Sequence, residues 1–226
     1  MPILLLLIIV LVIVYLPQHW VKKVLNQYNQ QQEDFPGTGG ELARHLLDRF
    51  DLQHVKIETT DQGDHYDPTT QTLRLTPDKH DGKTLTAITV AAHECGHALQ
   101  HAAREPLFMW RSHMAWVSVW ASRIGSFLIF AAPFLVVISR APSIAVLNIL
   151  AAFLIMGVAI IVQLITLPVE LDASFNKALP LLQSGYLKPE QMPAARKILK
   201  AAAWTYVAAS LASLLNFWRW MAMLRR

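Results

Sequence analysis

An uncharged run of 26 residues, 144–169, constrains the fold more than any other feature of the sequence. About 20 apolar residues in a helix are enough to cross the hydrocarbon core of a bilayer. A second run, residues 124–139, is almost wholly apolar and is followed by the turn-forming sequence Arg140-Ala141-Pro142-Ser143. The two runs therefore predict a transmembrane hairpin of two helices within residues 114–169.

Two further apolar runs lie near the ends of the sequence. Residues 1–21 lack the leading positive charges and the small-residue cleavage site of a secretory signal, so we expect an uncleaved membrane anchor. Residues 201–218 are also apolar, and segment 201–226 is expected to form a membrane or interfacial helix. With the hairpin, these runs predict an integral membrane protein with about four membrane helices.

The composition agrees with this class. Hydrophobic residues make up 54% of the 226 residues, and charged residues only 16%. The formal net charge of +4 is too small and too dispersed to indicate nucleic-acid binding. Cys95 is the single cysteine, which excludes an intrachain disulfide. The expected partners are the lipid bilayer and a protein or peptide substrate, with no nucleic acid.

The distribution of lysine and arginine predicts the orientation in the membrane. Eleven of these residues lie in residues 22–123 and five in residues 177–200, whereas the hairpin turn has only Arg140. Positive charge favours the cytoplasmic side, so the polar parts are expected in the cytoplasm and the turn outside. The last apolar run is followed by three arginines that would lie outside if it crossed completely, so it can instead be re-entrant or interfacial.

The polar residues 22–113 predict a small α+β unit within a mostly helical chain. Thr38 is expected to cap a helix over residues 41–50, and the apolar face of that helix is formed by Leu42, Leu46 and Leu47. Alternating apolar residues predict strands over 53–59 and 71–76. Residues 61–68 between them have the composition of a turn. An alanine-rich helix is expected over residues 85–103.

The sequence His93-Glu94-Cys95-Gly96-His97 lies within this last predicted helix. Histidines four residues apart lie on one helix face, so both imidazoles can reach one zinc ion. Glu94 can then face a metal-activated water and accept its proton. The alternative is a helix whose polar face holds two histidines by coincidence.

A third zinc ligand has to come from outside the motif. The residues that the extended metzincin motif and the inverted motif require are replaced by Gly96, Gln100 and Ala103. The carboxylates that follow the motif are Glu105, Glu170, Asp172 and Glu190. Glu170 directly follows the uncharged run, where a carboxylate is costly unless it is partnered. Two spans separate it from His97 and return it to the same side, so we expect Glu170 to be the ligand; the alternative is that it marks the water interface.

Three segments together resemble the YugP-type membrane zinc peptidases: DHYDPTTQTLRLT, VAAHECGHALQHA and LITLPVELDAS. This family is similar to the gluzincin clan, which includes the HtpX and CAAX-protease enzymes. The resemblance covers most of the chain and implies a zincin-like catalytic domain that binds Zn²⁺, with Glu94 as the base and Glu170 as third ligand. Ser174 stands where clan relatives often have aspartate, which leaves open the residue that orients a zinc-binding histidine.

Two neighbouring features give weaker signals. His65 and Tyr66 can donate hydrogen bonds to an oxyanion, or they can simply belong to a turn. The strand around residues 73–75 precedes the motif helix and is expected to be a sheet edge to which a peptide can pair; an ordinary structural strand is the alternative. Cys95 and His101 are expected to be a buried small residue and a polar residue at a helix end.

These observations predict a membrane-bound endopeptidase in which zinc and Glu94 activate water. The expected segments are an N-terminal anchor (1–21), a cytoplasmic zincin-like part (22–113), a transmembrane hairpin (114–169), a third-ligand segment (170–200) and a C-terminal helix (201–226). One alternative is a non-catalytic membrane adaptor with a degenerate or structural metal site, although structural zinc usually has four Cys or His ligands. The other is an intramembrane protease of the site-2 type, but residues 85–92 are too short to place the motif within a span.

Overall fold

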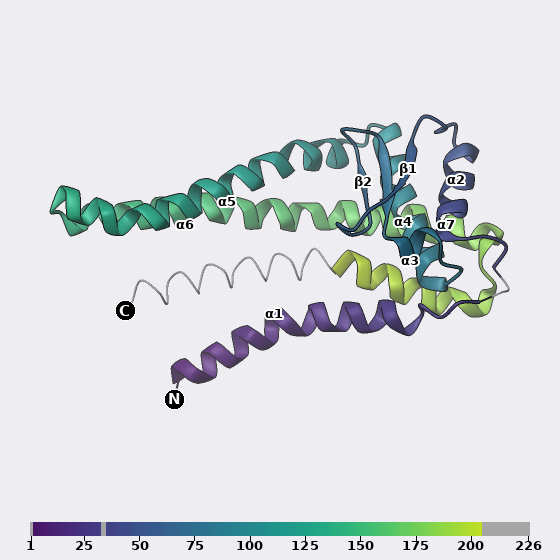
Figure 1. Ribbon diagram of the computed structural model, residues 1–226, viewed down its shortest axis with the longest axis horizontal. Helices are drawn as coiled ribbons and strands as arrows, with labels where there is room; N and C mark the ends of the chain where they lie inside the picture. The colour runs from purple at the N-terminus through teal and green to yellow at the C-terminus, as the bar shows by residue number, and fades with distance from the viewer. Residues whose placement is uncertain (1, 33–34, 205–226) are drawn as a thin grey trace.

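The computed structural model describes residues 2–32 and 35–204. Figure 1 shows a head that contains the sheet and the short helices, and long helices that extend from the head in one direction. The long helices are α1 (Pro2–Gln27), α5 (Pro106–Ser139) and α6 (Pro142–Leu171). The predicted fold class, mostly helical with a small sheet, is confirmed.

Helices α5 and α6 form the predicted hairpin; they lie side by side near the turn and spread apart toward the head (Figure 1). The turn between them is short because Arg140 adopts a left-handed backbone with φ 54°, and α6 begins at Pro142. The side-chain amide of Asn148 donates a hydrogen bond of 2.6 Å to the carbonyl oxygen of Leu128. The hairpin therefore leaves the head along α5 and returns to it at the end of α6.

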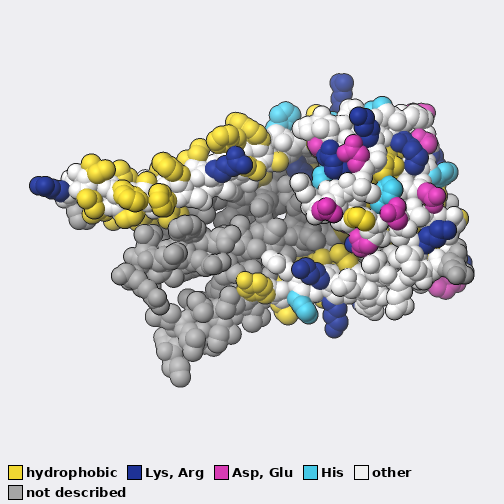
Figure 2. All heavy atoms as spheres, viewed as in Figure 1, with side chains coloured by type: hydrophobic (Ala, Val, Ile, Leu, Met, Phe, Trp, Pro, Cys, Tyr) yellow, Lys and Arg dark blue, Asp and Glu magenta, His cyan; other side chains and the backbone are white. Residues whose placement is uncertain are grey.

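Among the residues that the structure describes, α5 is the helix long and apolar enough to cross a membrane. Figure 2 shows hydrophobic side chains gathered along the extended arm. The exposed large side chains on α5 include Phe127, Phe130, Phe134, Val137 and Ile138. The prediction of about four membrane helices is not confirmed, and residues 205–226, which contain most of the last predicted run, lie outside the described residues.

The head contains a three-stranded sheet with the order β1-β3-β2. Its strands are β1 (Lys56–Thr59), β2 (His65–Asp67) and β3 (Thr72–Leu75). Strand β3 pairs in parallel with β1 and antiparallel with β2. The prediction that the strand around residues 73–75 is a sheet edge is therefore wrong, because β3 has a neighbour on both sides.

Strand β2 lies within residues 61–68, whose composition predicts a turn, so that prediction is wrong for the three residues of the strand. The strand forms because Tyr66 lies opposite Leu73 in the antiparallel ladder, and both side chains are buried. The residues before and after β2 do form turns: Gly63 has φ 93°, and the Asp67 carboxylate accepts hydrogen bonds from Thr69 and Thr70.

The two predicted helices of the head are present with nearly the expected bounds. Helix α2 (Gly39–Arg49) begins with a capping box between Thr38 and Glu41 and buries the three predicted leucines. Helix α4 (Leu85–Ala102) begins after Thr84, whose hydroxyl accepts a hydrogen bond from the Ala87 backbone. A short helix, α3 (Pro77–His80), precedes it. Almost all of α4 is buried, so it forms the centre of the head.

The chain that follows α6 continues as wider and shorter helical turns. These are η1 (Asp172–Ala178) and η2 (Leu182–Tyr186), which are π-helical, α7 (Leu179–Leu181) between them, and the 3₁₀ turn η3 (Pro189–Gln191). Residues 192–204 are helical again. Segment η1 packs against α4, which brings the end of α6 beside the centre of the motif helix.

Candidate metal centre

Helix α4 presents His93 and His97 on one face, one turn apart. Their side chains are almost fully buried, and their ring centroids are 4.7 Å apart. The spacing of four residues produces this arrangement because it matches the helical period. The prediction that both imidazoles lie on one face is thus confirmed.

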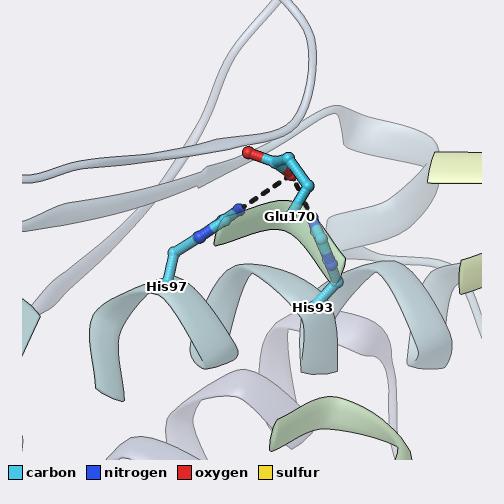
Figure 3. A group of neighbouring side chains, drawn as sticks. All are labelled: His93, His97 and Glu170. Carbon is cyan, nitrogen blue, oxygen red and sulfur yellow. Dashed lines mark hydrogen bonds and ion pairs between the residues drawn. The ribbon is translucent and has the colours of Figure 1, made fainter. Parts of the chain in front are cut away.

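Glu170 reaches this face from the end of α6, and its side chain is completely buried. Figure 3 shows the carboxylate opposite both imidazoles, with one oxygen directed at the two rings. The Oε2 atom is 3.3 Å from Nε2 of His93 and 3.3 Å from Nε2 of His97. One candidate ligand atom from each residue lies within 4.8 Å of the others.

These separations suit a tetrahedral metal ion. Zinc bonds to histidine nitrogen and carboxylate oxygen are about 2.0–2.1 Å long, so two ligand atoms in a tetrahedral site lie about 3.4 Å apart. The observed nitrogen–oxygen separations of 3.3 Å match this value. Two imidazoles and one carboxylate are also a donor set typical of catalytic zinc. The residues present therefore fit the metal that the sequence predicts.

The electrostatics of the group favour an ionised Glu170. Burial alone would raise the pKa of this carboxyl group, but the neighbouring histidines and Arg111 outweigh it and hold the pKa well below its usual range. The Arg111 guanidinium contacts Oε1 at 2.9 Å. The other oxygen, Oε2, faces the histidines, so the carboxylate is oriented to offer one oxygen to a metal.

Each histidine is held by a partner on the far side of its ring. The Nδ1 atom of His93 lies 3.0 Å from the Ser174 hydroxyl, and Nδ1 of His97 lies 2.9 Å from the side-chain amide oxygen (Oε1) of Gln100. Such partners orient a metal-binding imidazole and set which nitrogen carries the proton. Ser174 thus contacts a histidine from the position at which clan relatives often have aspartate.

The comparisons with known proteins agree with this geometry. Residues 3–225 match the family described as "Putative neutral zinc metallopeptidase". The chain belongs to this family. It is also 34% identical over 208 residues to the "Putative membrane protease YugP" of Bacillus subtilis strain 168. The aligned residues cover 90% of this chain and 88% of that protein. No solved structure matches the chain.

The close approach of helix α4 and segment η1 depends on Gly96, because a larger residue would not fit between them. A Cβ atom at this position would lie 2.7 Å from the carbonyl oxygen of Ala173 in η1. No ordinary side chain fits there unless the backbone moves. Because Ala173 lies between Glu170 and Ser174 in sequence, this contact sets how near both residues come to the histidines.

The other carboxylates that follow the motif lie outside the group of three. Glu105 forms an ion pair of 2.7 Å with Lys177, and Glu190 is exposed at the start of η3. Asp172 accepts hydrogen bonds from Gln100 and Asn176. Its side chain points toward these amides, so of the four candidates only Glu170 shares an oxygen with the histidines.

Glu94 is buried beside the group, and burial raises the pKa of its carboxyl group. A carboxyl group with a raised pKa in a polar site is a common feature of acid–base catalysts. Cys95 is buried on another side of α4, where its Sγ atom lies 3.7 Å from the Ala43 carbonyl oxygen. This thiol is therefore directed away from the histidines, as the prediction of a buried small residue requires.

The two candidates for oxyanion contacts have other partners. The Tyr66 hydroxyl lies 2.8 Å from Nδ1 of His101, and burial together with Asp67 raises the pKa of Tyr66 to about 12. Nδ1 of His65 contacts the Gly63 carbonyl oxygen at 2.8 Å. Neither residue belongs to the group of possible metal ligands among the described residues, so an oxyanion role stays a prediction.

A cavity of about 630 Å³ opens on the Tyr66 side of α4. Ala98, His101 and Met109 contribute to its wall, together with residues of the loop before β1. The ring of Phe108 packs near the rings of both Tyr66 and His97, with centroid distances of 6.4 Å and 6.0 Å. Phe108 therefore contacts both the Tyr66–His101 pair and one histidine of the candidate metal site.

Sequence reasoning missed the contacts of Gln100 and Arg111. In the sequence, Gln100 shows only that the metzincin motif does not fit, and Arg111 is one of many positive charges. The spacing from His97 to Gln100 could have indicated a shared helix face, since residues three apart are neighbours. Nothing local in the sequence pointed to Arg111, whose partner Glu170 is on another helix.

Proposed function

We propose that this chain is a membrane-bound, zinc-dependent endopeptidase whose metal ligands are His93, His97 and Glu170. The observation that carries the proposal is the convergence of both imidazoles on one carboxylate oxygen, at separations that suit tetrahedral zinc. Membership of a zinc metallopeptidase family supports the activity. The description of the Bacillus subtilis relative as a membrane protease supports the membrane location.

Three protein ligands leave a fourth position open, which is typical of catalytic zinc, whereas structural zinc usually has four protein ligands. Zinc bound at such a site supplies Lewis acidity, which brings the pKa of a water to about 7 and polarises a peptide carbonyl. Glu94 accepts the proton of the attacking water and then gives it to the leaving amine. Ser174 and Gln100 keep the two imidazoles oriented throughout.

We further propose a multi-pass arrangement with the head on the cytoplasmic side. The excess of lysine and arginine in residues 22–123 and 177–200 supports this orientation. The α5–α6 hairpin also supports it, because both of its ends join the head (Figure 1). A site at this junction would receive protein or peptide substrates at the membrane surface.

The proposal is tested by measuring zinc content and proteolysis on the same purified protein. We expect one zinc per chain and hydrolysis of an unstructured protein such as casein, which a chelator abolishes. Glu170→Ala is expected to lose zinc and activity together, because two imidazoles alone hold zinc weakly. Glu190→Ala is the matched control, and both properties are expected to stay near wild type. Zinc without any hydrolysis would favour the adaptor function, and a wild type without zinc would contradict the metal site.

A further inference from the structure

Gln100 has a buried side chain whose polar atoms all have specific partners. It lies on α4 three residues after His97 and is 1% exposed. Gln100 is neither a proposed metal ligand nor a proposed carrier of the proton. A buried amide is costly unless its hydrogen bonds are made, so the partners of Gln100 indicate why this residue is there.

The amide nitrogen of Gln100 contacts two acceptors that flank Glu170 in sequence. It donates to the carbonyl oxygen of Val169 at 3.0 Å and to Oδ2 of Asp172 at 2.8 Å. Both partners are acceptors only, so they fix which end of the amide is the nitrogen. The side chain of Gln100 thereby binds the residue before Glu170 and the residue two positions after it.

The side-chain amide oxygen (Oε1) of Gln100 consequently faces His97, at 2.9 Å from Nδ1. Because this oxygen can only accept, Nδ1 must carry the proton of a neutral imidazole. The unprotonated Nε2 atom then points toward Oε2 of Glu170, 3.3 Å away. One amide thus sets the tautomer of a histidine on α4 and holds the end of α6 that carries the glutamate.

We propose that Gln100 is a positioning residue that couples the two helices of the metal site, so that His97 and Glu170 reach the ion together. This inference rests on the proposed zinc site. Ser174 orients His93 from η1 through a single contact, whereas Gln100 contacts both sides of the site at once. Its replacement therefore disturbs the distance between ligands as well as the orientation of one ring.

The informative variant is Gln100→Glu, which keeps the size of the side chain and an oxygen for His97. It removes both donors and puts a carboxylate beside that of Asp172. Residues that hold metal ligands typically change metal affinity by about 10–100-fold when replaced. We expect a loss of this size in zinc affinity, measured by competition with a chromogenic chelator.

A second substitution at position 172 tests whether the lost zinc affinity can be restored, because it exchanges donor and acceptor across the contact between residues 100 and 172. In the double variant Gln100→Glu/Asp172→Asn, the new amide at position 172 can donate to the new carboxylate, and the like-charge contact disappears. We expect it to recover most of the affinity that Gln100→Glu loses, while Asp172→Asn alone loses less than Gln100→Glu. Gln53→Glu makes the same chemical change at an exposed position in the loop before β1 and is the matched control.

The zinc-free melting temperature separates positioning from a purely structural role. If Gln100 only stabilised the head, the variant would melt earlier without zinc but bind zinc as tightly as wild type, and this result would overturn the proposal. Absence of rescue in the double variant would also overturn it. A wild type that binds no zinc would instead refute the proposed function on which the inference rests.

Discussion

Replacing Gly96 with alanine adds a methyl group at the closest contact between α4 and η1. The new Cβ would lie 2.7 Å from the carbonyl oxygen of Ala173 and 3.3 Å from its carbonyl carbon. Carbon–oxygen contacts between backbones are normally about 3.3 Å or longer, so the two segments must separate by at least about 0.6 Å. The backbones of α4 and η1 meet at the centre of the head, so neither segment can move unless the residues packed around it move as well.

The expected cost follows from this separation. Overpacking a close-packed interior costs about 1–3 kcal/mol, and the better helix propensity of alanine returns about 1 kcal/mol. We therefore expect a net loss of up to about 2 kcal/mol in the free energy of unfolding. Glu170 and Ser174 move with Ala173, and a site of this kind requires placement within about 0.5 Å, so zinc affinity is expected to fall more than stability.

Zinc titration and thermal unfolding of the purified variant measure these two effects. Gly157→Ala is the matched control, because it makes the same change within helix α6 where nothing lies within 4 Å of the new Cβ. The control is expected to bind zinc as wild type does. If Gly96→Ala did so too, the described contact between α4 and η1 would not govern the metal site, and the reasoning would be refuted.

Three further predictions concern the surroundings of the site and the membrane. Ser174→Ala removes the partner of Nδ1 in His93, so zinc affinity is expected to fall by about 10–100-fold; an unchanged chelator titration would contradict this. Arg111→Met removes a positive charge that compensates the buried Glu170 carboxylate. The melting temperature is therefore expected to fall more in the zinc-free protein than in the zinc-bound protein, and an equal fall in the two forms would contradict this role of Arg111. Reporters inserted after Lys83 and at Ser143 are expected to be cytoplasmic and external, respectively, and the reverse pattern would overturn the orientation.

Local features of the head were predictable because their causes lie within a few residues. Thr38 and Glu41 cap α2 through contacts three residues apart, and the leucines of that helix are buried as their spacing requires. The motif helix and the hairpin turn at Arg140 were predictable for the same reason. Each depends on backbone propensity or periodicity, which the sequence displays directly.

The arrangement of the sheet was not predictable, because it depends on contacts between distant segments. Strand β2 has only three residues, too few for an alternating pattern, and its central residue Tyr66 is buried through pairing with Leu73. The central place of β3 likewise follows from the order in which the strands pair. A sequence pattern predicts that a strand exists more readily than it predicts the neighbours of that strand.

The candidate site falls between these cases. Glu170 could be singled out because a carboxylate beside an uncharged run is costly without a partner, and the structure brings it to the two histidines. The contacts of Gln100 with Val169 and Asp172 join residues 69 and 72 positions apart. They depend on the register with which α6 returns to the head, and no local pattern encodes that register.

The most direct test of the zinc peptidase mechanism is the zinc content and proteolytic rate of Glu94→Gln, measured on one preparation. This change removes the proposed base without removing a proposed ligand, so we expect zinc to stay at the wild-type level. Hydrolysis is expected to fall by at least about 10²–10⁴-fold, the contribution of a positioned general base. Glu190→Gln, the same change at an exposed residue, is expected to keep both. Wild-type turnover in Glu94→Gln would contradict the mechanism.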